Sequence, residues 1–488
     1  MQLNKVKKKD ISLIILILLS ALLMRLTLLD LRPLHHDESV NEYFLSNLIK
    51  SNSYKYNPDN YHGPFLYYIT LPFTFISTTE ITLRLAEVLF GSVLCILPFL
   101  IVPLSKKAKI LSSIFLMLSP SLFYYSRYAI HEIFFAFFTL LALVSLINLT
   151  TKNSKKIWIY FFILSIFLSY ANKETAIINC FCILIALVTM LFSKERRANL
   201  KENLFEKKNG KSQLTKHLFI AIALGILVHI ALFSSFFTYP KGVIDSIIGP
   251  FNWRTRTNEH AKPIYYFIKI LLKLELPILL ISLTSVLYYT LQLIKKKKPE
   301  TKTYICLFGF LLLIIYSLIS YKTPWLVLSF ACIFCVIAGD FLSKIPNKYI
   351  LIILSAICII YLIYQLIMTS FIYPADDEKN PFSYVHTDIN LKKNINEIAY
   401  GKDSIEIVGD SADYWPLPFY LKGRISAYSN VESFLNTLES SKDKNVLIRE
   451  QDFERIEDAI NIHYIVAEQK NLTIRSGSSY IFLDLKKG

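Results

Sequence analysis

The segment Leu31 to Tyr43, LRPLHHDESVNEY, places two histidines, an aspartate and a glutamate directly after a long apolar run. A carboxylate such as Asp37 or Glu38 can act as a general base when it lies within hydrogen-bonding reach of a substrate proton. Histidine beside carboxylates can also bind a divalent cation. The alternative is structural, with both acids lying at an interface and capping a helix that begins after Pro33. The choice between these roles depends on the elements around the segment.

The composition indicates a membrane protein. Of the 488 residues, 53% are hydrophobic and 14% aromatic, and only 13 are glycine. A helix that crosses a bilayer needs about 20 mainly apolar residues. Runs of this kind predict eleven spans, near residues 11–31, 84–104, 110–119, 133–150, 157–170, 175–192, 217–235, 276–294, 303–320, 325–341 and 349–371. A shorter apolar run at 63–76 predicts an interfacial or re-entrant helix.

The formal net charge of +16 could suggest nucleic-acid binding, but the positions of the basic residues give it another meaning. Lysine and arginine concentrate in alternate loops between the predicted spans, which is the positive-inside pattern. We therefore expect these loops and the N-terminus in the cytoplasm, and we expect no nucleic-acid partner. The first span resembles a signal peptide, but no small-residue cleavage site follows it, so an uncleaved span is favoured. The absence of a phosphate-binding loop motif argues against an ATPase.

An odd number of spans places the C-terminus outside the cell. From about Phe371, strand-like runs (SIEIVGD, NVLIRE, HYIVAE, SSYIFLDL) alternate with helix-like runs (LKKNINEIAY, VESFLNTLES, DFERIEDAI). This alternation predicts a small α/β domain. The predicted fold is therefore mainly α, with a polytopic domain at 1–371 that includes a first outer loop at 32–83, and an extracytoplasmic α/β domain at 372–488. We expect the protein in the cell (plasma) membrane.

The polar motifs concentrate on the outer side of the predicted membrane domain. They are NYHGPF (60–65), ITLRLAE (81–87), SPSLFYYSRYAIHE (119–132), ANKET (171–175), GPFNWRTRTNEHAKP (249–263) and SYKTPW (320–325). A charge near hydrocarbon costs about a few kcal/mol unless it is paired or hydrated. Clustering on one side therefore predicts a polar cavity that opens to the outer leaflet, where a lipid-anchored substrate with a charged head would fit.

The order of these motifs resembles that of the GT-C membrane glycosyltransferases, which include the protein O-mannosyltransferases and the aminoarabinose transferases of lipid A. The resemblance is carried by HHDE after the first span, YHGP in the outer loop, RLAEVLFG opening the second span, and SRYAIHE. With YKTPW, NPFSYVHT and WPLPFYL, the set more narrowly resembles a flippase-activity-associated subgroup of archaeal surface glycosylation. It covers roughly residues 10–420. Two departures are Glu132, where many relatives have aspartate, and the outer α/β domain in place of the carbohydrate-binding repeats of the eukaryotic enzymes.

The resemblance implies transfer of a sugar from a polyprenyl (dolichyl) phosphate in the outer leaflet to an acceptor on a glycan or a protein. It assigns the general base to Asp37, with Glu38 as the alternative. The departing lipid phosphate gains negative charge, so fixed cations beside it would stabilise the transition state. The candidates for this role are Arg84 and Arg127, followed by Lys173 and Lys322. The alternative for all four is snorkelling at the membrane edge, which is common for such side chains.

Further residues near the acids could position the acceptor or the sugar. Glu132 could do so, could assist a metal, or could pair with Arg127. His62 and His36 are candidates as well, although interfacial histidines are more often structural. Trp325 could stack on a sugar ring, or it could belong to the interfacial aromatic belt.

No metal site is predicted, because no fixed ligand spacing such as H-E-x-x-H occurs. If a divalent ion were bound, Asp37, Glu132 and His131 would be its ligands. No other cofactor is expected.

Two other functions fit the same sequence. A non-catalytic partner of a flippase or ligase would also bind lipid-linked sugars. A lipid-glycan transporter would instead place charges near the bilayer midplane and would have paired broken helices in repeated halves. Neither feature is found in the sequence, since the polar motifs lie at the outer edge.

Overall fold

The computed structural model describes residues 8–59, 62–208, 211–253, 260–295, 298–410, 413–439 and 442–487. The chain divides into two compact units. We call them the helical unit (Met1–Leu29 and Asn47–Phe371) and the α/β unit (Asp30–Ser46 and Ile372–Gly488). The acidic segment therefore belongs to the same unit as the C-terminal residues, which the sequence did not indicate.

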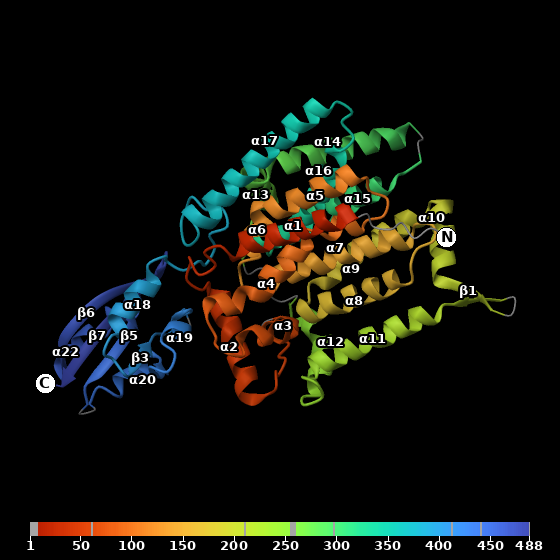
Figure 1. The fold of residues 1–488 in the computed structure, drawn as a ribbon. Coiled ribbons are helices and arrows are strands. Elements are labelled where there is room, and N and C mark those ends of the chain that lie inside the picture. Colours follow the sequence, from red (N-terminus) through yellow and green to blue (C-terminus); the bar gives the residue numbers. More distant parts are fainter. Residues whose placement is uncertain are drawn as a thin grey trace. The chain divides into compact units, whose positions relative to one another are not determined.

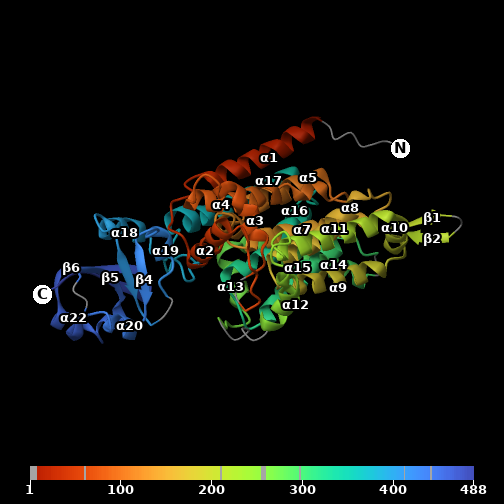
Figure 2. The same cartoon turned by 90° about the horizontal axis from the view of Figure 1, so that it is seen from below.

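Every apolar run that predicts a span lies on a helix of the described chain. In the helical unit these helices run side by side as a bundle (Figures 1 and 2). They are α1 (Lys8–Leu26), α4 (Glu80–Leu94), α5 (Lys106–Leu118), α7 (Glu132–Leu149), α8 (Ile157–Asn172), α9 (Ala176–Leu191), α11 (Lys216–Phe233), α14 (Leu276–Ile294), α15 (Thr301–Leu318), α16 (Leu328–Leu342) and α17 (Lys348–Ile367). The prediction of a mainly helical, polytopic fold is confirmed.

The number of membrane spans stays a prediction. Among the described residues, six helices are long and apolar enough to cross a membrane, or up to seven if one bent pair counts as a single span. The six are Glu132–Leu149, Lys216–Phe233, Leu276–Ile294, Thr301–Leu318, Pro324–Leu342 and Lys348–Ile372. The bent pair joins α9 to α10 at an angle of 113°.

Shorter elements of the helical unit connect these helices. They are α3 (Phe65–Thr74), η1 (Leu97–Leu100), α6 (Pro120–Tyr125), α10 (Lys194–Leu204), a hairpin of β1 (Phe205–Lys208) and β2 (Lys211–Leu214), α12 (Lys241–Trp253), α13 (Tyr266–Leu274), η3 (Pro324–Val327) and η4 (Met368–Ile372). Helix α2 (His36–Ser51) begins in the α/β unit, and its last turn belongs to the helical unit. The apolar run at 63–76 forms the short helix α3.

Helices α7 and α16 form the centre of the bundle. Both are apolar on all sides, and nearly all of their residues are buried. A helix that is hydrophobic all round belongs in a core or a membrane. Helix α16 approaches α5 closely at Gly339, where a Cβ would lie 2.4 Å from the backbone nitrogen of Ser112.

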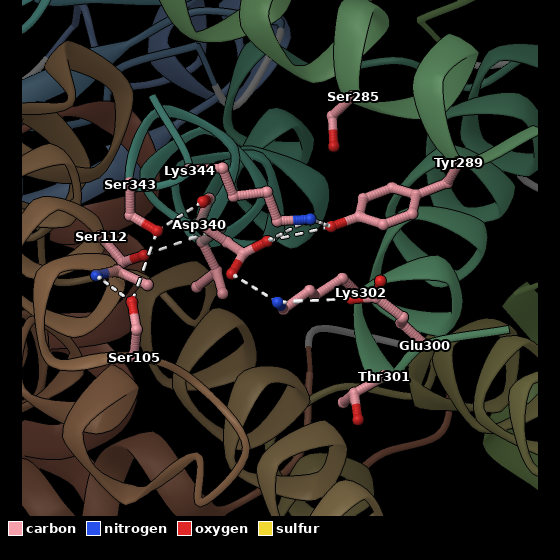
Figure 3. Close-up of polar contacts among 12 residues, drawn as sticks. Ser105, Ser112, Ser285, Tyr289, Glu300, Thr301, Lys302, Asp340, Ser343 and Lys344 are labelled. Carbon is pink, nitrogen blue, oxygen red and sulfur yellow. Dashed lines mark hydrogen bonds and ion pairs between the residues drawn. The ribbon is translucent and has the colours of Figure 1, made fainter. Parts of the chain in front are cut away.

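A polar cluster ties α14, α15 and α16 together at one end of the bundle (Figure 3). Its centre is Asp340, which is 3% exposed. Lys302 and Lys344 lie 3.7 and 3.8 Å from the Asp340 carboxylate, and the Tyr289 hydroxyl donates to it at 3.2 Å. Lys302 also lies 3.4 Å from Glu300. Because a buried carboxylate is costly without partners, these contacts explain how the acid is tolerated.

The α/β unit contains a five-stranded sheet in the order β4-β3-β5-β7-β6. Strands β4, β3 and β5 are parallel, and β7 pairs antiparallel with both β5 and β6. The strands are β3 (Ile405–Val408), β4 (Ile425–Ser429), β5 (Lys444–Arg449), β6 (Tyr464–Arg475) and β7 (Ser478–Lys487). The helices are α18 (Leu391–Ala399), α19 (Leu417–Tyr420), α20 (Val431–Leu435), α21 (Glu450–Phe453) and α22 (Glu457–His463).

Alternating side chains give this sheet two buried faces. On β7, Tyr480 and Phe482 pack with α18 and α19, whereas Ile481 and Leu483 pack with α20, α21 and α22. Figure 2 shows α18 on one side of the sheet and α20 and α22 on the other. This is the period of two expected for a strand covered on both sides. The prediction of a C-terminal α/β fold is confirmed.

The close approach of α5 and α16 can be tested with Gly339→Ala. We expect it to lower the free energy of unfolding by about 1–3 kcal/mol, because added volume in a packed core forces the backbone to move. Thermal unfolding of the purified protein in detergent measures the change.

Gly309→Ala on α15 is the matched control. The nearest atom to a Cβ at Gly309 is a side-chain carbon of Ile333 at 3.0 Å, which can shift more easily than backbone. An equal loss of stability in the two variants would contradict the assigned α5–α16 contact.

Candidate functional site

The acidic motif lies at the N-terminus of α2. The backbone N–H of His35 donates to Glu38 Oε2 at 2.9 Å, and the N–H of Asp37 donates to His35 Nδ1 at 3.0 Å. These bonds use donors that a helix N-terminus leaves without intrahelical partners. Glu38 is fully buried, whereas Asp37 is partly exposed. The two acids therefore have different surroundings, and Glu38 contributes to the helix start.

Hydrogen bonds fix this motif within the α/β unit. The N–H of Leu34 donates to the Tyr420 hydroxyl at 2.8 Å, and Thr387 Oγ1 donates to the Leu34 carbonyl at 2.6 Å. His35 Nε2 lies 2.8 Å from the Tyr384 carbonyl, to which it can donate. Since Nδ1 accepts and Nε2 donates, both bonds are satisfied by a neutral imidazole. Burial lowers the pKa of His35 to about 4, in agreement with that form.

His36 faces a charged pair of the same unit. Its Nδ1 lies 3.4 Å from Nη1 of Arg475, which also forms an ion pair with Asp413. Burial lowers the pKa of His36 to about 4, while the charge of Asp37 opposes the shift. His36 is therefore neutral at pH 7 and carries no positive charge.

A second polar cluster lies in the helical unit, where α7 begins and α8 ends. Lys173 forms an ion pair with Glu132 at 2.5 Å, and both side chains are almost fully buried. The Asn172 side chain donates to the His131 carbonyl at 2.8 Å and lies 3.3 Å from His131 Nδ1. Of the three roles that the sequence left open for Glu132, pairing occurs, but with Lys173. The two residues balance each other's charge.

Glu174 extends this cluster to the segment between α2 and α3, which the sequence predicts to be part of the first outer loop. The Tyr56 hydroxyl donates to Glu174 Oε1 at 2.9 Å, and His62 Nδ1 lies 2.9 Å from Oε2. Burial raises the pKa of Glu174. The glycine of YHGP allows this approach, because a Cβ at Gly63 would lie 2.2 Å from the backbone oxygen of Ala171.

Three buried arginines lie near the end of α1. The Arg84 and Arg127 guanidiniums donate to the carbonyls of Leu29 and Leu28 at 2.7 and 2.6 Å. Arg25 Nε donates to Ser126 Oγ at 2.8 Å. The guanidiniums of Arg25 and Arg127 each lie 5.4 Å from the ring centre of Phe123. All three arginines are at most 1% exposed, so they do not snorkel into solvent.

The remaining predicted residues lie between α15 and α16, in the segment predicted as the fifth outer loop. Lys322 is 2% exposed, and its ammonium donates to the carbonyls of Lys262 at 3.0 Å and Ile319. The ring of Trp325 is also buried and lies edge-on to Tyr125, with centroids 6.2 Å apart. Trp325 is thus packed inside the helical unit.

The predicted site residues therefore fall into two groups. His36, Asp37 and Glu38 belong to the α/β unit, and the other predicted residues belong to the helical unit. Residues 60–61 and 254–259, which form parts of two predicted outer-loop motifs, lie outside the described residues. Within the described ranges, no group of three His, Cys, Asp or Glu side chains is placed to hold a metal ion.

Sequence reasoning did not single out several members of these clusters. Arg25 lies inside the first apolar run. A single arginine there is easily interpreted as a residue at the membrane edge, so the sequence does not mark it as part of a site. Glu174 occurs in the ANKET motif beside Lys173, so the motif that predicts Lys173 also points to Glu174. Tyr56 and Arg475 carry no local sequence pattern that distinguishes them from the other tyrosines and arginines of the chain.

Comparison with known proteins supports the class that the motifs suggest. The family model of dolichyl-phosphate-mannose-protein mannosyltransferase matches residues 53–240. Among curated proteins, none matches the chain.

Three solved structures share the fold. ArnT from Cupriavidus metallidurans in the apo state matches with a TM-score of 0.69 at 12% identity, covering 98% of each chain. The same protein bound to undecaprenyl phosphate gives 0.66 at 12% identity, covering 96% of this chain and 97% of that one. The oligosaccharyltransferase of Archaeoglobus fulgidus, in complex with zinc and sulfate, matches with a TM-score of 0.56 at 13% identity. The match covers 92% of this chain and 67% of that one. The chain has a GT-C fold, and with the family match it is a membrane glycosyltransferase by class.

The Glu132–Lys173 pair can be tested by removing one or both partners. We expect Lys173→Met alone to lower the free energy of unfolding by about 3–5 kcal/mol, because it leaves a buried carboxylate without its partner. The double variant Glu132→Gln/Lys173→Met should cost less than the sum of the single changes. A double-mutant cycle from thermal unfolding measures the coupling, and additive losses would contradict the pairing.

The environment of His35 predicts a loss of stability in acid. An unfolded histidine has a pKa of about 6.5, so above that pH both states are neutral. Between pH 6.5 and the folded pKa of about 4, only the unfolded state binds the proton. Stability should then fall by about 1.4 kcal/mol per pH unit for this residue as the pH decreases.

His35→Gln removes this titration while it keeps a donor for the Tyr384 carbonyl. We expect a shallower pH dependence in the variant, measured by hydrogen exchange of the β7 amides between pH 7 and pH 4.5. Equal slopes in wild type and variant would show that His35 is not held in its neutral form.

Proposed function

We propose that this protein transfers a sugar from a polyprenyl-phosphate donor to an acceptor on the extracytoplasmic face of the membrane, with Asp37 as the general base. The observation that carries the proposal is the partly exposed carboxylate of Asp37 at a rigid helix start. A base must be reachable by the acceptor and held in place. Asp37 combines both properties, since its own N–H is bonded to His35.

The neighbours of Asp37 support this choice of base. Glu38 is fully buried and accepts from the His35 backbone, so it is less accessible to an acceptor. His36 is neutral at pH 7 because burial lowers its pKa to about 4. Asp37 is the partly exposed carboxylate of the motif, so it is the acid that an acceptor hydroxyl can reach.

The buried arginines support a site for the donor phosphate. Arg25, Arg84 and Arg127 concentrate positive charge in a part of the helical unit that water does not reach. Preorganised cations in such surroundings stabilise developing negative charge more strongly than cations in water. In this proposal they hold the departing lipid phosphate, with Lys322 as a further candidate. ArnT, whose fold is similar, has been solved with undecaprenyl phosphate bound.

An apolar groove of about 530 Å³ supports binding of an isoprenoid chain. Its lining includes Phe167 and Tyr170 of α8, Ile177 of α9, and Pro250 of α12. The groove adjoins the polar cluster, because a Cβ at Gly249, the residue before Pro250, would lie 2.4 Å from the Tyr56 hydroxyl. A lipid with its chain in this groove would place its head near Glu174 and His62.

Substitution of Asp37 by asparagine tests the base. We expect Asp37→Asn to lower transfer by about 10²–10⁴-fold, the usual contribution of a general base, while donor binding is kept. The assay follows radiolabelled mannose from polyprenyl-phosphate mannose to a membrane glycan and protein fraction in proteoliposomes. Asp30→Asn is the matched control, since Asp30 is an exposed acid of the same segment.

The outcomes separate the proposed function from its alternatives. Transfer that survives Asp37→Asn would place the base elsewhere. Donor binding without transfer in wild-type protein would favour the non-catalytic partner. Movement of the lipid-linked sugar across the bilayer without transfer would favour the transporter.

A further inference from the structure

A basic pocket lies at the end of the helical unit that carries the basic loops. Its volume is about 810 Å³, and its lining includes Lys152, Lys194, Arg196, Lys298 and Thr301. Among the lining residues of the described chain, Glu195 is the acid. The pocket therefore has an excess of positive charge.

The pocket is distinct from the polar cluster around Glu132. Helix α7 begins at Glu132 and ends at Leu149, directly before Thr150 of the pocket lining. Since a helix rises 1.5 Å per residue, its 18 residues separate the two places by about 27 Å. On the other side, the 113° bend from α9 to α10 brings Lys194 and Arg196 over the helix ends. The charge pattern of the loops predicts that this end faces the cytoplasm.

Arg196 is held in place by neutral groups. Its guanidinium donates to Thr150 Oγ1 at 3.0 Å and to Thr301 Oγ1 at 2.5 Å, and it lies 4.9 Å from the ring centre of Tyr304. These contacts orient the side chain without forming an ion pair, although the charge of the neighbouring Glu195 acts on it. A guanidinium fixed in this way is suited to bind a phosphate through its remaining donors.

The lysines of the pocket differ from those of the neighbouring Asp340 cluster. Lys302 and Lys344 form ion pairs with Asp340, and Lys302 also pairs with Glu300, as Figure 3 shows. By contrast, the exposed side chains of Lys152, Lys194 and Lys298 form no ion pair with another residue of the described ranges. Their charges are therefore available to an anion from outside.

The pocket also has an apolar border. Phe192 is 81% exposed, Leu293 is 42% exposed and Leu307 is 37% exposed, and all three belong to the lining. A small soluble anion would make no favourable contact with these apolar side chains. A phospholipid would use both parts, with its phosphate among the cations and its acyl chains along the apolar side chains of α9, α14 and α15.

We propose that this pocket binds the headgroup of an anionic phospholipid. Basic pockets between helices at the cytoplasmic side of membrane proteins are suited to such headgroups. The inference is independent of the proposed transfer reaction, because the pocket lies at the other end of α7.

The test compares two double variants of the full-length protein in detergent. Lys194→Ala/Lys298→Ala removes two pocket charges, and Lys155→Ala/Lys348→Ala removes two exposed charges that do not line the pocket. Phosphatidylglycerol, phosphatidylcholine and inorganic phosphate are titrated separately, and binding is followed by native mass spectrometry and thermal shift. Each basic residue near an anionic lipid contributes about 1 kcal/mol, so the pocket variant should bind phosphatidylglycerol about thirtyfold more weakly.

The control variant should bind phosphatidylglycerol like the wild type. Equal weakening in both variants would show diffuse attraction to the basic surface and would overturn the proposal. Equal binding of phosphatidylcholine, or an equal effect of inorganic phosphate alone, would also overturn it. Without lipid, both variants should unfold at the same temperature as the wild type. This verifies that the exposed lysines are not needed for folding.

Discussion

The attachment of the acidic segment to the α/β unit is the constraint on which the proposed chemistry depends. Three hydrogen bonds join Leu34 and His35 to residues that follow them by 349 to 386 positions in the chain. The start of α2, and with it Asp37, is therefore positioned by the C-terminal residues. This gives the α/β unit a role that its sequence does not suggest, since it holds the candidate base. Damage to its sheet should affect the acid motif as well as the domain itself.

The cost of burying charge explains the arrangement of the helical unit. A carboxylate or ammonium loses several kcal/mol of hydration when it is taken from water, and a partner must offset that loss. Glu132 has Lys173, Glu174 has Tyr56 and His62, and Asp340 has two lysines and a tyrosine. Most of these partners come from different segments of the chain, so each contact also fixes the packing of the segments that carry it.

The sequence predicts the elements well but not the contacts between distant segments. Each apolar run corresponds to a helix, because length and hydrophobicity are local properties. The runs SIEIVGD and SSYIFLDL contain β3 and β7, whose alternating apolar residues are buried. Strand β4, Ile425–Ser429, was missed because it lies at the sheet edge and is mostly exposed, so it lacks that alternation. The contact of Leu34 with Tyr420 and the pairing of Lys173 with Glu132 depend on tertiary packing, and no local pattern encodes them.

The cost of leaving a buried charge without its partner also bears on the candidate phosphate ligands. Lys173 already pairs with Glu132, so a phosphate could recruit it only by displacing that carboxylate and leaving it buried. The guanidiniums of Arg84 and Arg127 donate to backbone carbonyls, which are neutral, and each guanidinium has five N–H donors. Lys173 is thus better placed to hold α8 against α7 than to bind a lipid phosphate.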